Sequence, residues 1–375
     1  MNLIKTVLVT GSNGYIGSLL TPLLEKEGFK VIGLDATYFD DPECYFKPRT
    51  ENPAKGEARQ RRQEPRTPPR ARLARGGKNQ FKFIKKDVRY ISHEDLKGID
   101  AVCHLAALSN DPMGEINPEL TFEINLRASE KLANLAKTAG VKKFLFSSSC
   151  SVYGAIGDGQ EITEETPTDP KTAYAISKVE FEKSLLKLAD NNFCPVILRN
   201  ATAYGSSPKF RADLVMNNFA ANAFDTGEIK IMSDGTPWRP IIHAEDIARI
   251  FVALLKTPDE KVRGQIINCG QNKENFQVRD IALAVQAALP KIKITFASKP
   301  DKDSRTYKVN FDKLKKLLPD FQFKWNLKKA AADLCADFKT YGLPQNVLKQ
   351  KHFIRLKQIQ HLLKTKRVNP DLFWK

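Results

Sequence analysis

Three glycines spaced three residues apart, Gly11, Gly14 and Gly17, join an apolar run to an amphipathic one near the start of the chain. Residues 3–9 predict a buried strand and residues 15–26 a helix, because the apolar positions change from a continuous run to helical spacing. Gly11 permits a tight turn, Gly14 lets the backbone approach a phosphate group, and Gly17 allows close helix packing. The N-terminus of the helix that follows favours negative charge. This arrangement predicts a nucleotide-binding βαβ unit.

Strands and helices alternate along the next part of the chain. Strands are predicted at 30–35, 81–85, 100–105, 142–147 and 195–198, and helices at 118–139 and 172–190. This alternation indicates a Rossmann-type α/β fold, in which a doubly wound parallel sheet binds ligands at the carboxyl ends of its strands.

Beyond residue 200 the alternation becomes irregular, and prolines separate shorter elements. We expect a dinucleotide-binding Rossmann domain at 1–199, a smaller mixed α/β substrate-binding lobe at 200–345, and a basic amphipathic helix and tail at 346–375. Helix 244–256 and strand 265–269 are compatible with a return to the first domain, so the placement of 244–270 stays open.

The net charge of +17 is concentrated in two segments. Residues 43–78 carry eleven Lys or Arg against four Glu, and residues 346–375 carry eight against one Asp. Segment 43–78 is rich in Pro, Arg and Gly and poor in large apolar residues, which favours a disordered surface insertion over an RNA-binding arm. We therefore expect no nucleic-acid partner.

The C-terminal segment 346–366 has apolar residues at helical spacing with lysines between them. This pattern favours docking on the body or on a second subunit over association with a membrane. No apolar run reaches the ~20 residues of a membrane span, and the first residues lead into a strand instead of a signal peptide. We expect a cytoplasmic protein with neither disulfides nor a metal site, since the six cysteines show no Cys-x-x-Cys spacing.

Asp35 ends the second strand, 18 residues after Gly17. A carboxylate at this position accepts hydrogen bonds from the ribose hydroxyls of NAD and repels a 2′-phosphate. No arginine follows it directly, so NAD is predicted as the cofactor over NADP.

Tyr174 and Lys178 form a Tyr-x-x-x-Lys pair downstream of Ser149. Residues four apart lie on one face of a helix, which brings the ammonium close to the phenol. A nearby cation lowers the pKa of a tyrosine from about 10, so that the phenol can take a proton from an alcohol. The pattern predicts an enzyme that oxidises an alcohol beside a hydride acceptor.

With these motifs the chain resembles the extended short-chain dehydrogenase/reductases, in the group of NAD-dependent nucleotide-sugar epimerases and dehydratases. The resemblance extends to segments 86–89, 104–107, 147–154 and 234–246. The resemblance implies that Tyr174 is the base, that Lys178 binds the nicotinamide ribose and lowers the pKa of Tyr174, and that Ser149 hydrogen-bonds the reacting sugar oxygen. It implies a homodimer. The cofactor-binding residues that it implies are Gly11, Asn13, Gly14, Tyr15, Ile16, Gly17, Asp35, Asp87, Val88, Leu105, Ala106, Ala107, Asn125, Tyr174 and Lys178.

The resemblance also implies contacts with the substrate. Arg239 matches the arginine that grips the substrate diphosphate, and Arg305 is a second candidate because guanidinium groups suit phosphate oxygens. Arg211 either faces the sugar or pairs on the surface. The expected substrate-binding set is Ser109, Ser149, Thr202, Arg211, Arg239 and Arg305.

The chain departs from the family pattern in two places. The dehydratases of this group usually carry an Asp-Glu pair directly after the active serine or threonine, where this chain has Cys150 and Ser151. Where the epimerases commonly have an asparagine for the diphosphate, this chain aligns Thr202, with Asn200 two places earlier. The first departure disfavours dehydration, and Cys150 is expected to pack in the core.

The predicted function is an NAD-dependent nucleotide-sugar 4-epimerase, an isomerase that acts through a transient 4-keto sugar, with UDP-glucose and UDP-galactose as the default pair by resemblance. A sugar-nucleotide 4-dehydrogenase or 4-keto reductase uses the same three residues and stays open. A non-catalytic NAD-binding scaffold with an RNA-binding arm at 43–78 is a third reading.

Overall fold

The computed structural model describes residues 4–40, 46, 81–154, 161–297 and 306–375. The predicted insertion 43–78 lies outside the described residues except for Phe46, and Arg305 also lies outside them.

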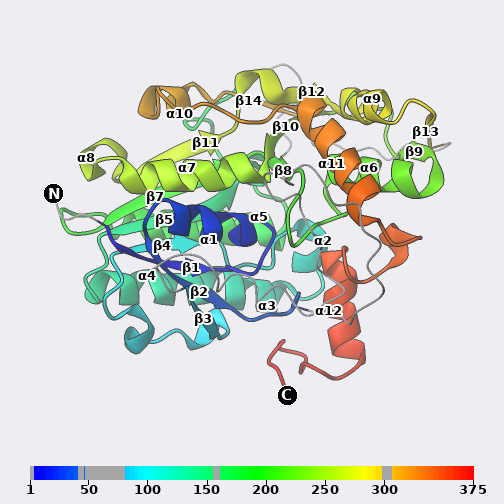
Figure 1. Cartoon of the computed structure of the whole chain (residues 1–375). Helices are drawn as coiled ribbons and strands as arrows, with labels where there is room; N and C mark the ends of the chain where they lie inside the picture. Colours follow the sequence, from blue (N-terminus) through cyan, green and yellow to red (C-terminus); the bar gives the residue numbers. More distant parts are fainter. Residues whose placement is uncertain (1–3, 41–45, 47–80, 155–160, 298–305) are drawn as a thin grey trace, which may run out of the picture.

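A seven-stranded parallel sheet forms the centre of the molecule, in the order β11-β7-β5-β4-β1-β2-β3 (Figure 1). The chain winds in both directions from β1, whose neighbours are β2 on one side and β4 on the other. This topology confirms the predicted doubly wound fold and places a crevice at the carboxyl ends of β1 and β4. The strands are β1 (Thr6–Thr10), β2 (Lys30–Asp35), β3 (Lys82–Lys85), β4 (Ala101–His104), β5 (Lys143–Ser149), β7 (Cys194–Asn200) and β11 (Gln265–Cys269).

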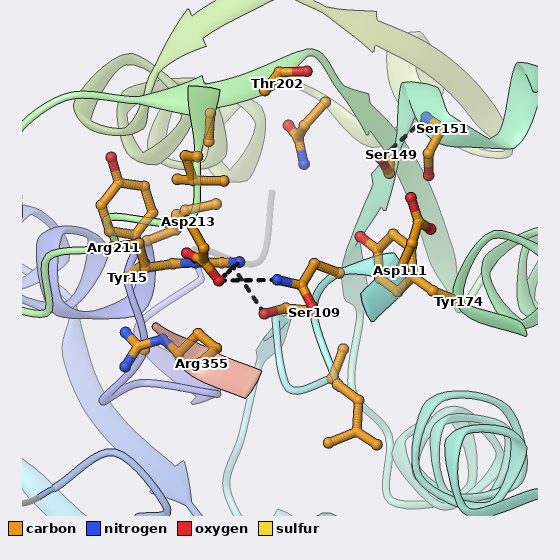
Figure 2. A pocket seen from close by; sticks show the side chains of 18 of the residues that line it. Tyr15, Ser109, Asp111, Ser149, Ser151, Tyr174, Thr202, Arg211, Asp213 and Arg355 are labelled. Atoms are coloured by element: carbon orange, nitrogen blue, oxygen red, sulfur yellow. Dashed lines mark hydrogen bonds and ion pairs between the residues drawn. The ribbon is translucent and has the colours of Figure 1, made fainter. Parts of the chain in front are cut away.

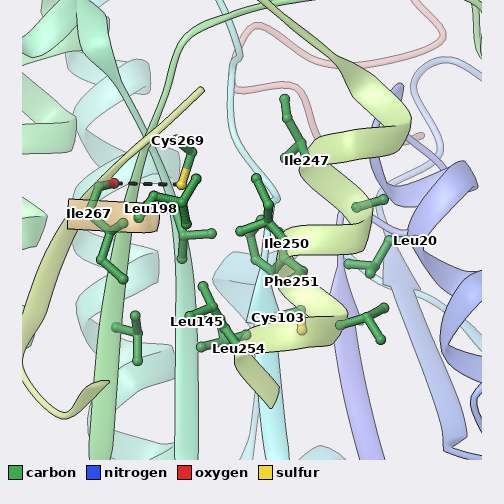
Figure 3. Close-up of a cluster of buried hydrophobic side chains, with 14 of the residues drawn as sticks. Leu20, Cys103, Leu145, Leu198, Ile247, Ile250, Phe251, Leu254, Ile267 and Cys269 are labelled. Carbon is green, nitrogen blue, oxygen red and sulfur yellow. Dashed lines mark hydrogen bonds between the residues drawn. The ribbon is translucent and has the colours of Figure 1, made fainter. Parts of the chain in front are cut away.

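Both faces of this sheet are buried, because side chains alternate along each strand. In β1, Val7 and Val9 belong to one apolar core and Leu8 to another. Helices α1 (Gly17–Lys26) and α7 (Ala244–Lys256) cover the first face (Figures 1 and 3). The opposite face is covered by α4 (Ala128–Thr138) and α5 (Ala173–Leu186).

The predicted helix 118–139 forms as three consecutive helical pieces. It begins as α3 (Pro118–Phe122), passes through a π-helical turn at Glu123–Arg127, and continues as α4. The π turn contains Asn125, and π-bulges are frequent at functional sites.

A second lobe lies beyond the carboxyl ends of the strands and has an apolar core of its own. Its three-stranded sheet has the order β12-β10-β8, and β13 pairs with β9 and β14 with β6. Between these elements, α7 and β11 return to the central sheet, where β11 pairs with β7. The strands outside the central sheet are β6 (Glu161–Ile162), β8 (Thr202–Tyr204), β9 (Glu228–Ile231), β10 (Trp238–His243), β12 (Asn275–Gln277), β13 (Lys293–Phe296) and β14 (Lys308–Val309). Of these, β6 and β14 pack on the core of the first lobe. The remaining helices are α2 (Asp111–Gly114), α6 (Val215–Thr226), α8 (Asp259–Val262), α9 (Val278–Ala288), α10 (Asp312–Leu317), α11 (Leu327–Tyr341) and α12 (Arg355–Lys364).

The C-terminal segment docks on the body of the protein. The predicted helix 346–366 was too long, because only α12 and a short 3-10 turn at Val347–Lys349 form in this stretch. Val347, Phe353 and Ile359 are nevertheless buried in the cores of the two lobes. In the part of the chain that the structure describes, no helix is long and apolar enough to cross a membrane.

Candidate active site

One cavity of about 1120 Å³ runs along the carboxyl ends of the strands, between the two lobes. The glycine turn, the end of β2, the loops after β4 and β5, and the start of α5 line it from the first lobe. All the predicted site residues line this cavity except Asn13, Asn125 and Arg305, the last of which lies outside the described residues.

The glycine turn leaves no room for side chains at two of its three positions. Gly11 has a φ of +70°, and a Cβ atom there would lie 2.8 Å from the backbone nitrogen of Ala106. At Gly17 a Cβ atom would lie 2.1 Å from the carbonyl oxygen of Gly11. Helix α1 therefore starts directly against the turn, with its N-terminus at the cavity.

Asp35 lies at the end of β2 and is held by the backbone. Its Oδ2 accepts from the N–H of Asn13 at 3.0 Å and its Oδ1 from the N–H of Thr37 at 2.7 Å. Burial raises the pKa of Asp35, and these two hydrogen bonds offset part of that rise. Asp35 lines the cavity one strand away from the glycine turn, so the two features fit the ribose and the diphosphate of NAD.

Asn13 and Asn125 support the site without lining the cavity. Asn13 holds Asp35 through its backbone N–H. Asn125 is buried, accepts from the N–H of Leu108 at 2.8 Å, and donates to Ser177 on α5 at 3.3 Å. Asn125 thus braces the loop after β4 against the helix that carries Tyr174.

Tyr174 lies one residue inside α5, whose N-cap is Thr172, and Ser149 ends β5. Figure 2 shows both side chains on the same wall of the cavity. The pKa of Tyr174 is raised to about 12, mainly by burial and also by the negative charge of Asp111, while a hydrogen bond with Ser149 and the charge of Arg211 offset part of the rise. The predicted lowering of this pKa is therefore wrong for the protein without ligands, because burial outweighs the cations.

Lys178 lies one turn after Tyr174 on α5. Its Nζ donates to the carbonyl oxygen of Ser147 at 2.8 Å and lies 5.7 Å from the centre of the Tyr174 ring. Burial lowers the pKa of Lys178 to about 7, and Glu182 opposes this change. The amine is thus held beside the phenol, and its charge titrates near neutral pH.

Asp111 is a site residue that the sequence analysis missed. It begins α2, and its Oδ1 accepts from the hydroxyl of Thr172 at 2.6 Å. Helix α2 packs directly on the start of α5, since a Cβ atom at Gly114 would lie 3.3 Å from the Cβ of Tyr174. The motif Asn-Asp-Pro indicates a helix start, but no signal in the sequence places it beside Tyr174.

Arg211 lines the cavity as half of a buried ion pair. Its Nε donates to Asp213 Oδ1 at 2.9 Å, its Nη2 to Asp213 Oδ2 at 3.1 Å, and its Nη1 to Ser109 at 3.1 Å (Figure 2). Asn110 completes the network by donating to Asp213 at 2.9 Å. Of the two alternatives left open, the structure thus favours the cavity over the surface for Arg211.

Two buried polar atoms at the cavity have no hydrogen-bond partner within the described residues, the Oγ of Ser151 and the Oδ1 of Asn200. Buried polar groups are normally satisfied, so these two atoms suit the hydroxyl groups of a ligand. Thr202 and Arg239 line the same cavity from β8 and β10 of the second lobe.

Cys150 packs in the core, as expected. It is 1% exposed, and its thiol donates to the carbonyl oxygen of Arg199 at 3.3 Å. His104 is also a satisfied core residue, hydrogen-bonded to Thr10 and Ser129, and burial lowers its pKa to about 3. Among the residues that the structure describes, no group of three or more His, Cys, Asp or Glu could hold a metal ion.

Comparison with known proteins adds to this geometry. A model of the NAD dependent epimerase/dehydratase family matches residues 7–270. The chain is 28% identical to a UDP-glucuronate 4-epimerase of Thermodesulfobacterium geofontis, over 86% of this chain and 94% of the relative. It is 25% identical to UDP-glucose 4-epimerase 1 of Oryza sativa subsp. japonica, over 89% and 94%. The fold matches that of TunA, an NAD-dependent NDP-hexosamine 5,6-dehydratase, with a TM-score of 0.71, 22% identity, and coverage of 90% of this chain and 98% of TunA.

Proposed function

This chain belongs to the NAD dependent epimerase/dehydratase family, and we propose that it is a nucleotide-sugar 4-epimerase that acts through a transient 4-keto sugar. The observation that carries the proposal is the placement of Tyr174 and Ser149 side by side in a cavity that also contains the dinucleotide turn and Asp35. The first lobe holds NAD and the second lobe closes over the nucleotide sugar. UDP-glucose and UDP-galactose are the first pair to test, since the rice relative carries that activity in its name.

Each of the three residues has a separate task in this proposal. Bound NAD supplies the acceptor for the hydride of C4 and a positive charge near the phenol. Tyr174 takes the proton of the 4-hydroxyl and later returns it to the same oxygen, when hydride would be returned to the other face of C4, while Ser149 hydrogen-bonds that oxygen. Lys178, fixed by Ser147, orients the nicotinamide ribose.

The charges of the cavity suit this reaction at a single carbon. Arg239 faces the cavity from β10 and is the group for the diphosphate, whereas small polar atoms of Ser151 and Asn200 lie where the sugar would turn. Tight contacts at the diphosphate and loose contacts at the sugar allow the keto sugar to present either face.

Dehydration fits the site less well. That reaction needs an acid and a base for C5 and C6, and here the thiol of Cys150 points into the core while Ser151 replaces the second carboxylate. A 4-dehydrogenase or 4-keto reductase uses the same residues as the epimerase. The experiment must therefore distinguish these two activities from epimerisation.

The test is an incubation of the purified protein with UDP-, GDP- and CDP-sugars. Sugar NMR signals and the absorbance of reduced nicotinamide are followed together. Conversion at C4 without accumulation of reduced cofactor supports the epimerase, and stoichiometric reduction supports the dehydrogenase. The scaffold reading requires RNA binding through 43–78 that falls steeply with salt, with no sugar turnover.

We further propose that the protein is a cytoplasmic homodimer. Sedimentation of the full chain at micromolar concentration tests the dimer, and fractionation of source cells tests the location.

A further inference from the structure

The C-terminal segment, residues 355–375, lies near the carboxyl ends of β2 and β3 (Figure 1). Gln358 donates to the carbonyl oxygen of Tyr38 at 3.1 Å, and the indole of Trp374 donates to that of Ala36 at 2.6 Å. The hydroxyl of Tyr38 donates to the carbonyl oxygen of Leu372 at 2.7 Å. The segment therefore packs against the loop that comes after Asp35. Asp35 is the residue that we expect to bind the adenosine ribose.

Aromatic contacts fix the last residues of the chain on the same edge. The ring of Trp374 stacks on Tyr38 with 6.0 Å between centres and 27° between planes. Arg89 lies 3.6 Å above the ring of Phe373 and makes a bidentate ion pair with Asp87. Asp87 is one of the cofactor-binding residues that the resemblance implies, so the tail supports this residue through Arg89.

The segment is part of the core of the first lobe. Ile359, Leu362, Val368 and Leu372 are each at most 2% exposed and pack in the cluster that contains Leu8 of β1. Such burial makes this segment a fixed wall instead of a loose tail.

Arg355 is the residue of this segment that brings charge to the cavity. Its side chain is buried, its Nη2 donates to the carbonyl oxygen of Lys209 at 3.0 Å, and its guanidinium lies 4.1 Å from the centre of the Phe39 ring. It lines the cavity together with Ile354 and Leu356. Figure 2 shows it on the same side of the cavity as Tyr15, which lies between the second and third glycines of the turn.

The electrostatic neighbours of Arg355 place its charge between the two lobes. Burial raises the pKa of Tyr15 in the turn, and the charge of Arg355 opposes part of this rise. The pKa of Asp213 is lowered, against the effect of burial, mainly by Arg211 and also by Arg355. A guanidinium between the glycine turn and the loop after β2 faces the region where the diphosphate and the adenosine ribose meet.

We propose that residues 355–375 form the outer wall of the dinucleotide site and that Arg355 binds the adenosine diphosphate half of NAD, so that the cofactor stays bound between turnovers. The proposal rests on the NAD dependence of the family and is independent of the identity of the sugar. The guanidinium of Arg355 can donate two hydrogen bonds to the anionic diphosphate, and residues 355–375 close the adenine side of the site, so that NAD cannot leave there.

Arg355→Met tests the proposal, with Lys364→Met as a matched control. Lys364 lies on the same helix, carries the same charge, and is exposed. The measurements are the NAD content of the purified protein and calorimetric titration of the stripped protein with NAD, ADP-ribose and nicotinamide mononucleotide. We expect Arg355→Met to weaken NAD and ADP-ribose about tenfold or more and to leave the mononucleotide unchanged. We expect Lys364→Met to bind all three like the parent.

A second variant protects the test against a folding defect in Arg355→Met. Trp374→Ala removes the stack on Tyr38 and the hydrogen bond to Ala36, and circular dichroism verifies that each variant is folded. We expect NAD to dissociate from Trp374→Ala several-fold faster during gel filtration. If both variants, once folded, retain NAD like Lys364→Met, the proposal is overturned, whatever the protein does with nucleotide sugars.

Discussion

The sharpest structural prediction concerns the buried ion pair that fixes α5, the helix of Tyr174 and Lys178, to the sheet. Glu182 on α5 faces Arg199 on β7, with side-chain exposures of 3% and 5% and an Nη2–Oε2 distance of 2.7 Å. The Nε of Arg199 also donates to both carboxylate oxygens, and its Nη1 donates to the hydroxyl of Tyr153 at 3.0 Å. Ser148, next to the active serine, donates to Glu182 as well.

Glu182→Gln removes the negative charge and keeps the size of the side chain, but it replaces one acceptor oxygen by an NH2 donor. The change leaves the guanidinium of Arg199 buried without its counter-charge, which costs about 3–5 kcal/mol. Glu180→Gln is a matched control on the same helix, since Glu180 pairs with Lys183 at side-chain exposures of 46% and 61%. An exposed pair of this kind contributes about 0–1 kcal/mol.

The assay is urea unfolding of the parent and the variants, followed by fluorescence and circular dichroism. With a slope of about 3 kcal/mol/M, Glu182→Gln should move the midpoint by roughly 1 M or more and Glu180→Gln by at most about 0.3 M. The double variant Glu182→Gln/Arg199→Met should regain most of the loss, because no buried charge remains unpaired. A Glu182→Gln midpoint equal to that of Glu180→Gln would refute this reasoning.

Three further predictions concern the site itself. Burial lowers the pKa of Lys178 to about 7, whereas the unfolded chain keeps the ordinary value of about 10.4. Between these two pH values only the unfolded chain holds the proton, so the free energy of unfolding rises with pH. In urea unfolding of NAD-free protein, the parent should therefore gain about 2 kcal/mol over Lys178→Met between pH 7 and 9, and an equal pH dependence of the two proteins would contradict this. Asp111→Asn removes a charge that raises the pKa of Tyr174. Because a general base acts in its deprotonated form, the ascending acidic limb of the pH profile of kcat/KM should move to lower pH, and an unchanged limb would contradict the coupling of Asp111 to Tyr174. Gly17→Ala places a Cβ atom 2.1 Å from the carbonyl oxygen of Gly11, so the purified protein should lose its NAD, and full NAD content would show that the turn tolerates the side chain.

The elements with clear periodicity could be predicted from the sequence. The bounds of β2, α7 and β11 agree with the predicted ranges, because each is a short apolar or amphipathic run between turn residues. The glycine turn and Asp35 could be placed together because both follow strands of one βαβ unit.

Features that depend on tertiary packing could not be predicted in this way. Asp111 reaches Tyr174 only because α2 packs on α5, and Arg355 reaches the glycine turn across more than 300 residues of chain. The raised pKa of Tyr174 depends on how deeply the phenol is buried, which a Tyr-x-x-x-Lys spacing does not report. The start of α12 was also missed, since Asn346 adopts a left-handed conformation and a separate turn precedes the helix.

The central claim is that Tyr174 oxidises and re-reduces C4 of a nucleotide sugar beside a bound NAD that is not consumed. Its most direct test uses UDP-galactose that carries deuterium at C4, followed by NMR with the parent and with Tyr174→Phe. We expect UDP-glucose with the deuterium kept at C4, no accumulation of reduced nicotinamide, and a rate about 10²–10⁴-fold lower in Tyr174→Phe. Loss of the deuterium to water, or equal rates in the two proteins, would contradict it.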